Sequence, residues 1–340
     1  MTSPFEENRS IVQRTHSQTS GQLLSSYLSP QNNVMEDSEV AQRDIEMMFP
    51  PKPPIKCVHS ALSGDDLSWA KTKLIFAHGA GGTLKAEAIV NFTYGFTSSD
   101  TTPTILCFQG NMNLASRVKM FASILGSREG SLEKEARLSP VCLGGRSMGA
   151  RAAVKAATEE TTYLALVSYP LHTGKEVRDQ ILLDLPASTR VIFVSGSHDQ
   201  MCDLERLEHV RRQMKCKTWR IAVQNADHGM NVRPKSATRN VGRMTGALVA
   251  AWLDQCDEKL TEGTISWDSD NSAVRWSGWS QAAKALTASQ DDGAAKTTET
   301  STAPSEPEMK SLKRKSNKAL QNERRDEDPK LQRSKRLRKR

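Results

Sequence analysis

The sequence lacks any apolar run approaching the roughly 20 residues that a membrane-spanning helix needs. Its first ten residues carry two acids and no apolar segment, so no secretory signal is expected there. Only 37% of the 340 residues are apolar, which is little for a fully packed chain of this length. Part of the chain is therefore predicted to be unfolded, and a membrane partner is not expected.

Cysteine is also sparse and scattered. The six cysteines form no C-x-x-C pair and show no zinc-like spacing, so neither a structural zinc site nor a disulfide framework is predicted. Cys107 and Cys142 lie in apolar, strand-like runs, where cysteine usually serves as a small core residue. We expect a reduced, intracellular protein with no metal and no cofactor.

The net charge of +8 is unevenly distributed. Between Lys310 and Arg340 there are 14 lysines or arginines and 4 acids, so the rest of the chain sums to -2. A nucleic-acid-binding domain carries positive charge on its folded surface, which this one lacks. The basic clusters 313–315 and 335–340 instead favour nuclear localisation and weak contact with nucleic acid, the alternative being a solvated charged tail.

Composition divides the chain into four parts. Residues 1–53 are rich in Ser, Gln and Asn, end in prolines, and are predicted to be disordered. Residues 54–256 form the folded domain, with its clearest pattern from Leu74 to Gln255. Residues 257–309 hold three of the six tryptophans and a polar linker, and 310–340 form a basic disordered tail. The tryptophans indicate a docked hairpin or loop, or alternatively a partner-binding motif.

Within the domain, short apolar runs alternate with helix-like segments. Continuous apolar runs are typical of parallel strands covered on both faces. The pattern predicts an α/β-hydrolase fold, a mostly parallel sheet with helices on both faces and no large lid domain. Strands are expected at 74–77, 104–108, 141–143, 164–169, 191–195 and 218–223, and helices at 114–125, 147–158, 203–214 and 241–252.

The motif that carries chemistry is Gly145-Arg146-Ser147-Met148-Gly149, a G-x-S-x-G sequence. Alone it is weak, but here an apolar strand runs into it and an Ala-rich helix leaves it. A nucleophile elbow needs this strand-to-turn-to-helix order, because the sharp turn presents the serine at the end of the strand. Ser147 is the candidate nucleophile.

In this fold the triad follows the order serine, acid, histidine. His228 comes just after the strand expected at 218–223, where the base should fall. Asp199 follows the preceding strand and is the favoured acid, which would orient His228 and stabilise its charged form. Asp203 is the alternative acid, although it is well placed as a helix N-cap.

Other residues suggest how an acyl substrate would be held. The loop His78-Gly79-Ala80-Gly81-Gly82 follows a strand, and backbone N–H groups of Gly79 or Ala80, with that of Met148, are candidate oxyanion donors. No phosphate-binding glycine motif is present there. Arg146 and His172 are candidate substrate-binding residues, although Arg146 could equally pair with a structural acid.

The run Gly144 to Ala153 closely resembles a small α/β-hydrolase-like family. That family includes testis-expressed protein thirty and the third subunit of the non-specific-lethal histone acetyltransferase complex. The resemblance continues at 78–82, 168–172, 193–202 and 226–230, and extends more distantly to dienelactone hydrolases. It implies Ser147, Asp199 and His228 as catalytic positions.

Two hypotheses about function follow. One is a serine hydrolase acting on a small-molecule ester, thioester or amide, which the intact triad favours. The other is a non-catalytic nuclear scaffold within a chromatin-modifying complex, which the basic tail and the tryptophan segment favour.

Overall fold

The computed structural model describes residues 40–49, 52–62, 67–68, 71–99, 101–129, 140–174 and 176–282. Its strands are β1 (Val40–Phe49), β2 (Lys52–Leu62), β3 (Thr72–Ala77), β4 (Thr104–Phe108), β5 (Cys142–Arg146), β6 (Tyr163–Val167), β7 (His172–Thr173), β8 (Glu176–Val177), β9 (Arg190–Gly196), β10 (Lys217–Val223), β11 (Glu262–Asp268) and β12 (Ala273–Trp276). Its helices are α2 (Glu87–Thr97), α3 (Leu114–Glu129), α5 (Met148–Ala156), α6 (Gln180–Leu183), α7 (Leu204–Gln213) and α8 (Ala237–Asp254). None of these helices is long and apolar enough to cross a membrane.

The main sheet of the described residues has ten strands in the order β1-β2-β4-β3-β5-β6-β9-β10-β11-β12. The strands from β4 through β11 are parallel to their neighbours. Antiparallel pairing occurs only towards the two edges, where β2 pairs with β1 and β4, and β12 pairs with β11. All six predicted strands are present and form consecutive members of the parallel part.

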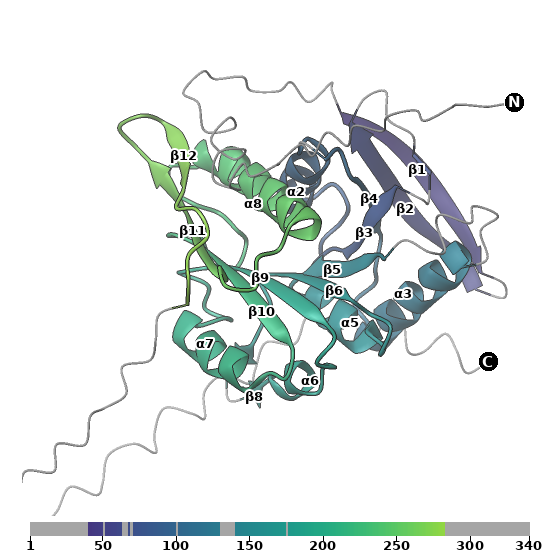
Figure 1. The fold of residues 1–340 in the computed structure, drawn as a ribbon. Coiled ribbons are helices and arrows are strands. Elements are labelled where there is room, and N and C mark those ends of the chain that lie inside the picture. Colours follow the sequence, from purple (N-terminus) through teal and green to yellow (C-terminus); the bar gives the residue numbers. More distant parts are fainter. Residues whose placement is uncertain are drawn as a thin grey trace, which may run out of the picture. The chain divides into compact units, whose positions relative to one another are not determined.

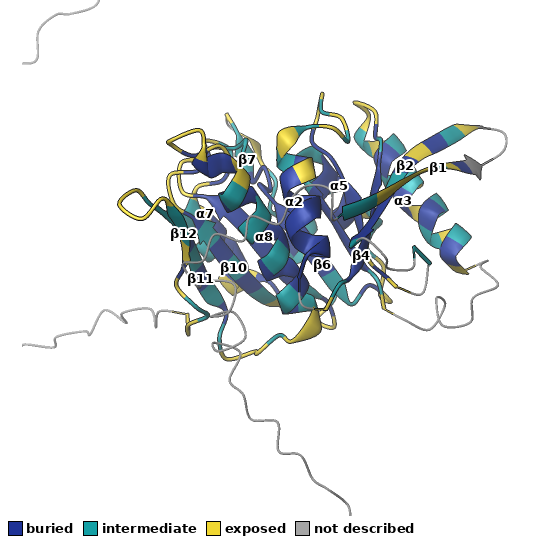
Figure 2. Cartoon of the chain, turned by 90° about the horizontal axis from the view of Figure 1, so that it is seen from above, coloured by how far each residue is buried: buried dark blue, intermediate teal, exposed yellow. Residues whose placement is uncertain are grey.

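Helices cover both faces of the sheet (Figure 1). One face packs against α3, α5, α6 and α7 through side chains such as Phe121, Leu182 and Leu207. The other packs against α2 and α8, where Phe92 and Leu248 are buried. Figure 2 shows that burial is concentrated in the strands and in the helix sides that face them. The predicted α/β-hydrolase architecture is confirmed, with the core split into two layers by the sheet.

The N-terminal part corrects the prediction that residues 1–53 are disordered. Residues 40–49 and 52–53 belong to the antiparallel pair β1 and β2, and β2 continues the sheet beside β4. Ile45 and Met47 face inward while Asp44 and Glu46 are exposed, as expected for an edge strand with one covered face. The prolines stand at the start of β2, a position that strands tolerate. Residues 1–39 lie outside the described part.

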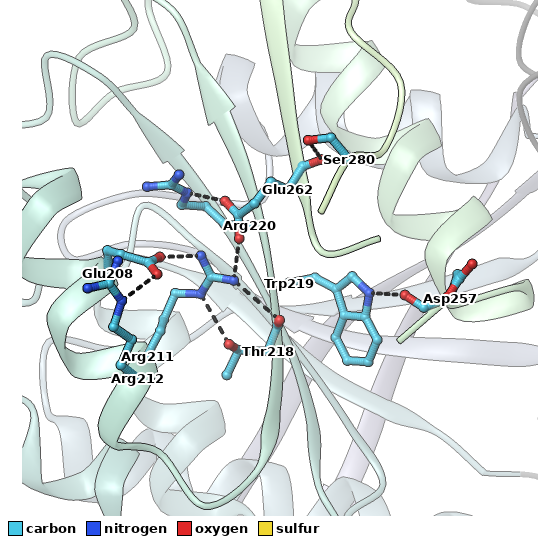
Figure 3. A network of polar contacts seen from close by, with 9 residues as sticks. All are labelled: Glu208, Arg211, Arg212, Thr218, Trp219, Arg220, Asp257, Glu262 and Ser280. Carbon is cyan, nitrogen blue, oxygen red and sulfur yellow. Dashed lines mark hydrogen bonds and ion pairs between the residues drawn. The ribbon is translucent and has the colours of Figure 1, made fainter. Parts of the chain in front are cut away.

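The sheet also continues past residue 256. β11 pairs in parallel with β10, and β12 returns antiparallel, so the tryptophan segment forms a docked hairpin. Figure 3 shows the polar network that joins it to the domain. Glu262 of β11 accepts from Arg211 of α7 and from Arg220 of β10, each at 2.7 Å. Arg211 is buried and also pairs with Glu208 at 2.8 Å, so these charges connect β11 to α7 and β10, which precede it by about 40 residues or more.

The segment between β6 and β9 is short. Its described residues form only β7, β8 and the four-residue helix α6, so no lid domain is inserted there. The four predicted helices are present, as α3, α5, α7 and α8, with ends shifted by a few residues. Helix α2 was not predicted, although its buried face packs along α8.

Candidate active site

The candidate residues come from loops at one edge of the sheet. Ser147 follows β5, Asp199 follows β9, His228 follows β10, and the loop beginning at His78 follows β3. Because these strands are parallel neighbours, their carboxyl ends meet at the same edge, where ligands bind in open α/β sheets. Topology therefore gathers residues that are far apart in the sequence.

Ser147 lies in a strained turn. Its φ of 54° and ψ of -116° fall where residues with a side chain are uncommon. The turn is tight because a Cβ at Gly149 would overlap the carbonyl of Ala77, and one at Gly145 would overlap the backbone of Gly149. Both glycines of the motif are therefore required by close backbone packing, and the strained serine is the geometry expected of a nucleophile elbow.

Three side chains form one hydrogen-bonded chain. Nε2 of His228 lies 2.9 Å from Oγ of Ser147, and Nδ1 lies 2.9 Å from each carboxylate oxygen of Asp199. The Asp199 side chain is fully buried, whereas that of His228 is 25% exposed. With Nδ1–H donating to the carboxylate, Nε2 is left as the acceptor that faces the serine hydroxyl.

The loop around Asp199 is fixed by its own backbone. Oδ1 of Asp199 also accepts from the N–H of Met201 at 2.8 Å. The N–H of His198 donates to the carbonyl of Ala226 in the base loop, the loop after β10 that carries His228. Asp203 takes a different position: it caps α7, accepting from the N–H of Arg206 at 2.9 Å. Of the two candidate acids, only Asp199 contacts His228.

Arg146 supports the base loop. Its guanidinium donates to the carbonyl oxygen of His228, and its partly buried side chain lies next to Gly79. Burial lowers the pKa of Arg146, while the charges of Asp199 and Asp227 act in the opposite direction. Arg146 therefore supports the loop of His228 through a backbone carbonyl, and not by pairing with a structural acid as the alternative expected.

His172 lies beside the acid loop, which is the loop after β9 that carries Asp199. Its N–H donates to the carbonyl of Met201 at 3.0 Å, and its Nε2 accepts from the N–H of Asp203 at 3.2 Å. These contacts tie β7 to the segment that carries Asp199. The structure does not join His172 to Ser147 or His228 by any hydrogen bond in the described residues.

The predicted oxyanion loop lies next to the serine. A Cβ at Gly79 would be 3.5 Å from Cβ of Ser147, so the loop and the elbow are in close contact. In the described part of the chain, the N–H groups of Gly79, Ala80 and Met148 donate to no protein acceptor. They are therefore available to a ligand oxygen beside Ser147.

Arg117 was missed by the sequence reasoning. It is fully buried under the oxyanion loop, where its three guanidinium nitrogens donate to the carbonyls of His78, Gly79 and Asn111. Burial lowers its pKa to about 10. A signal was present: Arg117 shares the buried stripe of α3 with Phe121 and Ile124, at helical spacing where an apolar residue is expected.

His78 completes the support of the loop. Its Nε2 accepts from the N–H of Gly110 at 2.9 Å, so Nδ1 carries the proton and donates to the carbonyl of Gly79 at 2.7 Å. Burial, together with the positive charge of Arg117, lowers the pKa of His78. The neutral form is the one that fits these contacts.

The cysteines take no part in this site. All six are free thiols, and five are buried. Within the residues that the structure describes, no group of three or more His, Cys, Asp or Glu side chains is arranged to hold a metal ion. The chemistry of the site rests on the serine, histidine and aspartate with the surrounding backbone amides.

Comparison with known structures finds several similar chains at low sequence identity. An alpha-beta serine hydrolase homologue from Coxiella burnetii is 16% identical with a TM-score of 0.47, over 59% of this chain and 96% of that one. A serine hydrolase without a lid from Xanthomonas campestris is 14% identical with a TM-score of 0.45, over 66% and 100%. Est1E from Butyrivibrio proteoclasticus is 13% identical with a TM-score of 0.44, over 61% and 99%.

A family comparison covers the residues that build the site. Residues 70–252 match the alpha/beta hydrolase domain family, and this range contains β3 to β10, the elbow and all three members of the hydrogen-bonded chain. The match spans more than half of the 340 residues. The chain therefore belongs to the alpha/beta hydrolase domain family.

Proposed function

We propose that this protein is a serine hydrolase that cleaves a small ester, thioester or amide. Ser147 is the nucleophile, His228 the general base, and Asp199 the residue that orients the imidazole. The observation that carries the proposal is the continuous hydrogen-bonded chain from the buried Asp199 carboxylate through His228 to Ser147 Oγ, with 2.9 Å at each link. A hydrolase in the broad sense is also what the family supports.

In the first half of the reaction, Oγ of Ser147 attacks the acyl carbon and its proton passes to Nε2 of His228. The Asp199 carboxylate stabilises the resulting imidazolium through Nδ1–H. The acyl oxygen becomes negatively charged as the tetrahedral intermediate forms. The N–H groups of Gly79, Ala80 and Met148 are the donors that we assign to this oxyanion.

Collapse of the intermediate breaks the bond to the alcohol, thiol or amine, which leaves with the proton from His228. In the second half, His228 removes a proton from water, and the hydroxide attacks the acyl carbon bound to Ser147. The acid is released and the proton returns to Oγ. Because only short elements lie between β6 and β9, we propose compact acyl substrates and not lipids that require a mobile lid.

A fluorophosphonate probe tests the nucleophile. The wild-type protein should gain one covalent adduct, located on Ser147 by peptide mass spectrometry, while Ser147→Ala should gain none and keep its fold by circular dichroism. Ser197→Ala, which changes an exposed serine in the acid loop, is a matched control that should still be labelled. Well-folded wild type that gains no adduct would contradict the proposal.

The alternative is a non-catalytic role as a nuclear scaffold, and the basic segment from Lys310 to Arg340 favours it. Under this alternative, the chain acts like the chromatin-complex members of the family that the Gly144 to Ala153 run resembles. Nuclear localisation, a nuclear protein complex as partner, and weak nucleic-acid contact are parts of this proposal. Absence of labelling at Ser147, with intact fold and nuclear location, would favour the scaffold.

A further inference from the structure

We propose that Arg117 is the positioning residue of the oxyanion hole, holding the loop after β3 so that its amides face Ser147. The proposal rests on the serine hydrolase function above and assigns a role to a residue that no motif identifies. Arg117 touches neither the substrate position nor the triad. It acts through the backbone of the loop, which it contacts at His78 and Gly79.

Peptide geometry connects these contacts to the amides. The peptide bonds after His78 and Gly79 are trans, so each carbonyl oxygen points opposite to the N–H of the next residue. Arg117 holds the carbonyl of His78, which turns the N–H of Gly79 away from the guanidinium. It also holds the carbonyl of Gly79 at 3.1 Å, which turns the N–H of Ala80 the same way. Both amides therefore point away from the guanidinium of Arg117.

A third contact holds the guanidinium of Arg117 in place. Nε of Arg117 donates to the carbonyl of Asn111 in the loop after β4, so the guanidinium joins the loops of two adjacent strands. A planar guanidinium has its donors in a rigid fork and suits this task. A lysine ammonium at the same place carries the charge, but it does not reproduce the fork geometry.

The charge of Arg117 supports the assignment. The guanidinium is fully buried, and in the described residues it forms no ion pair with a carboxylate. Burial of a charge without an opposite charge is costly, and an apolar residue on this helix stripe would pack without that cost. A positive charge beneath the oxyanion loop also stabilises the negative charge that develops on the acyl oxygen during the reaction. The hydrogen bonds of Arg117 and its charge therefore both favour stabilisation of the oxyanion.

Substitution of Arg117 tests the proposal with a small activated ester, p-nitrophenyl acetate. Arg117→Met should lower kcat about 10²-fold with little change in KM, since loss of one oxyanion donor typically costs about 10²- to 10³-fold. Arg117→Lys should recover about tenfold of that loss. Arg128→Met is the matched control, because it removes another buried arginine from α3 about 16 Å farther along the helix. Its kcat should stay within about twofold of wild type.

A second readout does not depend on catalysis. In ¹⁵N–¹H NMR spectra, the amide signals of Gly79 and Ala80 should shift in Arg117→Met and Arg117→Lys, and stay unchanged in Arg128→Met. If the wild type is inactive, the hydrolase proposal fails, while the amide signals still test whether Arg117 positions the loop after β3. Should Arg117→Met not fold, Arg117→Lys provides both measurements. Unchanged amide signals, or a rise in KM at constant kcat in a folded Arg117 variant, would overturn the inference.

Discussion

The guanidinium of Arg146 donates a hydrogen bond to the carbonyl oxygen of His228, so the residue before the nucleophile holds the loop that carries the base. Removing this donor leaves a partly buried carbonyl without its partner, which typically costs about 1–3 kcal/mol. Arg146→Met should lower the free energy of unfolding by about this amount in urea titrations, and should slow ester hydrolysis because His228 is less well held. Lys155→Met, on the exposed face of α5, should change neither. Equal stability of the two variants would show that the contact contributes nothing.

The two acidic candidates give a paired test. Asp199→Asn should reduce kcat by about 10⁴-fold, because an amide in place of the carboxylate no longer enforces the Nδ1–H tautomer of His228. Asp203→Ala should instead cost about 1 kcal/mol of stability through loss of the α7 cap, with kcat nearly unchanged. Steady-state kinetics and thermal melts measured on both variants separate these effects. An inactive Asp203→Ala beside an active Asp199→Asn would reverse the assignment.

His78 predicts how stability depends on pH. Its pKa in the folded protein is lowered from 6.5, by burial and by the charge of Arg117, so the unfolded chain takes up this proton first as the pH falls. Its contribution to the free energy of unfolding is therefore complete above about pH 6.5 and is lost as the pH falls towards the folded pKa. Unfolding titrations between about pH 8 and pH 5 should show this loss. His78→Gln should flatten that part of the curve, while His209→Gln, at an exposed site on α7, should leave it unchanged.

The buried cysteines predict low thiol reactivity. Burial raises the pKa of Cys57, Cys107 and Cys202 to about 12 and that of Cys216 to about 11, so little reactive thiolate forms near neutral pH. Iodoacetamide applied to the folded protein should modify only the half-buried Cys256, and all six thiols after denaturation. Intact-mass measurements on wild type and Cys256→Ser provide the count. Rapid modification of a second thiol in the folded state would show that the core opens readily.

We expect the basic C-terminal segment to act in localisation and nucleic-acid binding, independently of hydrolysis. Deletion of Lys310 to Arg340 should leave hydrolysis and melting temperature unchanged, since so polar a segment adds nothing to a packed core. It should move a fluorescently tagged protein from nucleus to cytoplasm and abolish weak, salt-dependent binding to nucleic acid. Microscopy and binding titrations at two salt concentrations measure these effects. A truncated protein that stays nuclear would assign the signal to another part of the chain.

The centre of the fold could be predicted because its signals are local. Most of the six predicted strands are continuous apolar runs, which are typical of strands covered on both faces. Ser147, Asp199 and His228 were found because the chain order and the glycine-rich turn restrict where each can lie. In the structure the three side chains are hydrogen-bonded to one another.

The parts that were not predicted depend on tertiary contacts. Helix α2 contains Ile, Val, Phe, Tyr and Thr, whose intrinsic preferences favour strands, and its packing against α8 decides its conformation. β1 alternates charged and apolar side chains only from Asp44 to Met47, a short signal next to the Ser- and Gln-rich residues that precede the strand. Arg117 follows no sequence motif, since its partners are backbone carbonyls of any residue type. Its position on the apolar stripe of α3 is the one sequence signal, and the loop contacts show its role.

The antiparallel strand β1 also has a consequence for how molecules of this protein meet. An outermost strand exposes backbone donors and acceptors that can pair with another chain and start aggregation. On β1 the side chains of Arg43, Asp44 and Glu46 are exposed, and charges at this position oppose the docking of a second sheet. Without β1 and β2, the outermost strand would be β4, whose five residues are all buried. We therefore expect the N-terminal hairpin to limit aggregation, because it keeps the apolar strand β4 from pairing with a neighbouring molecule.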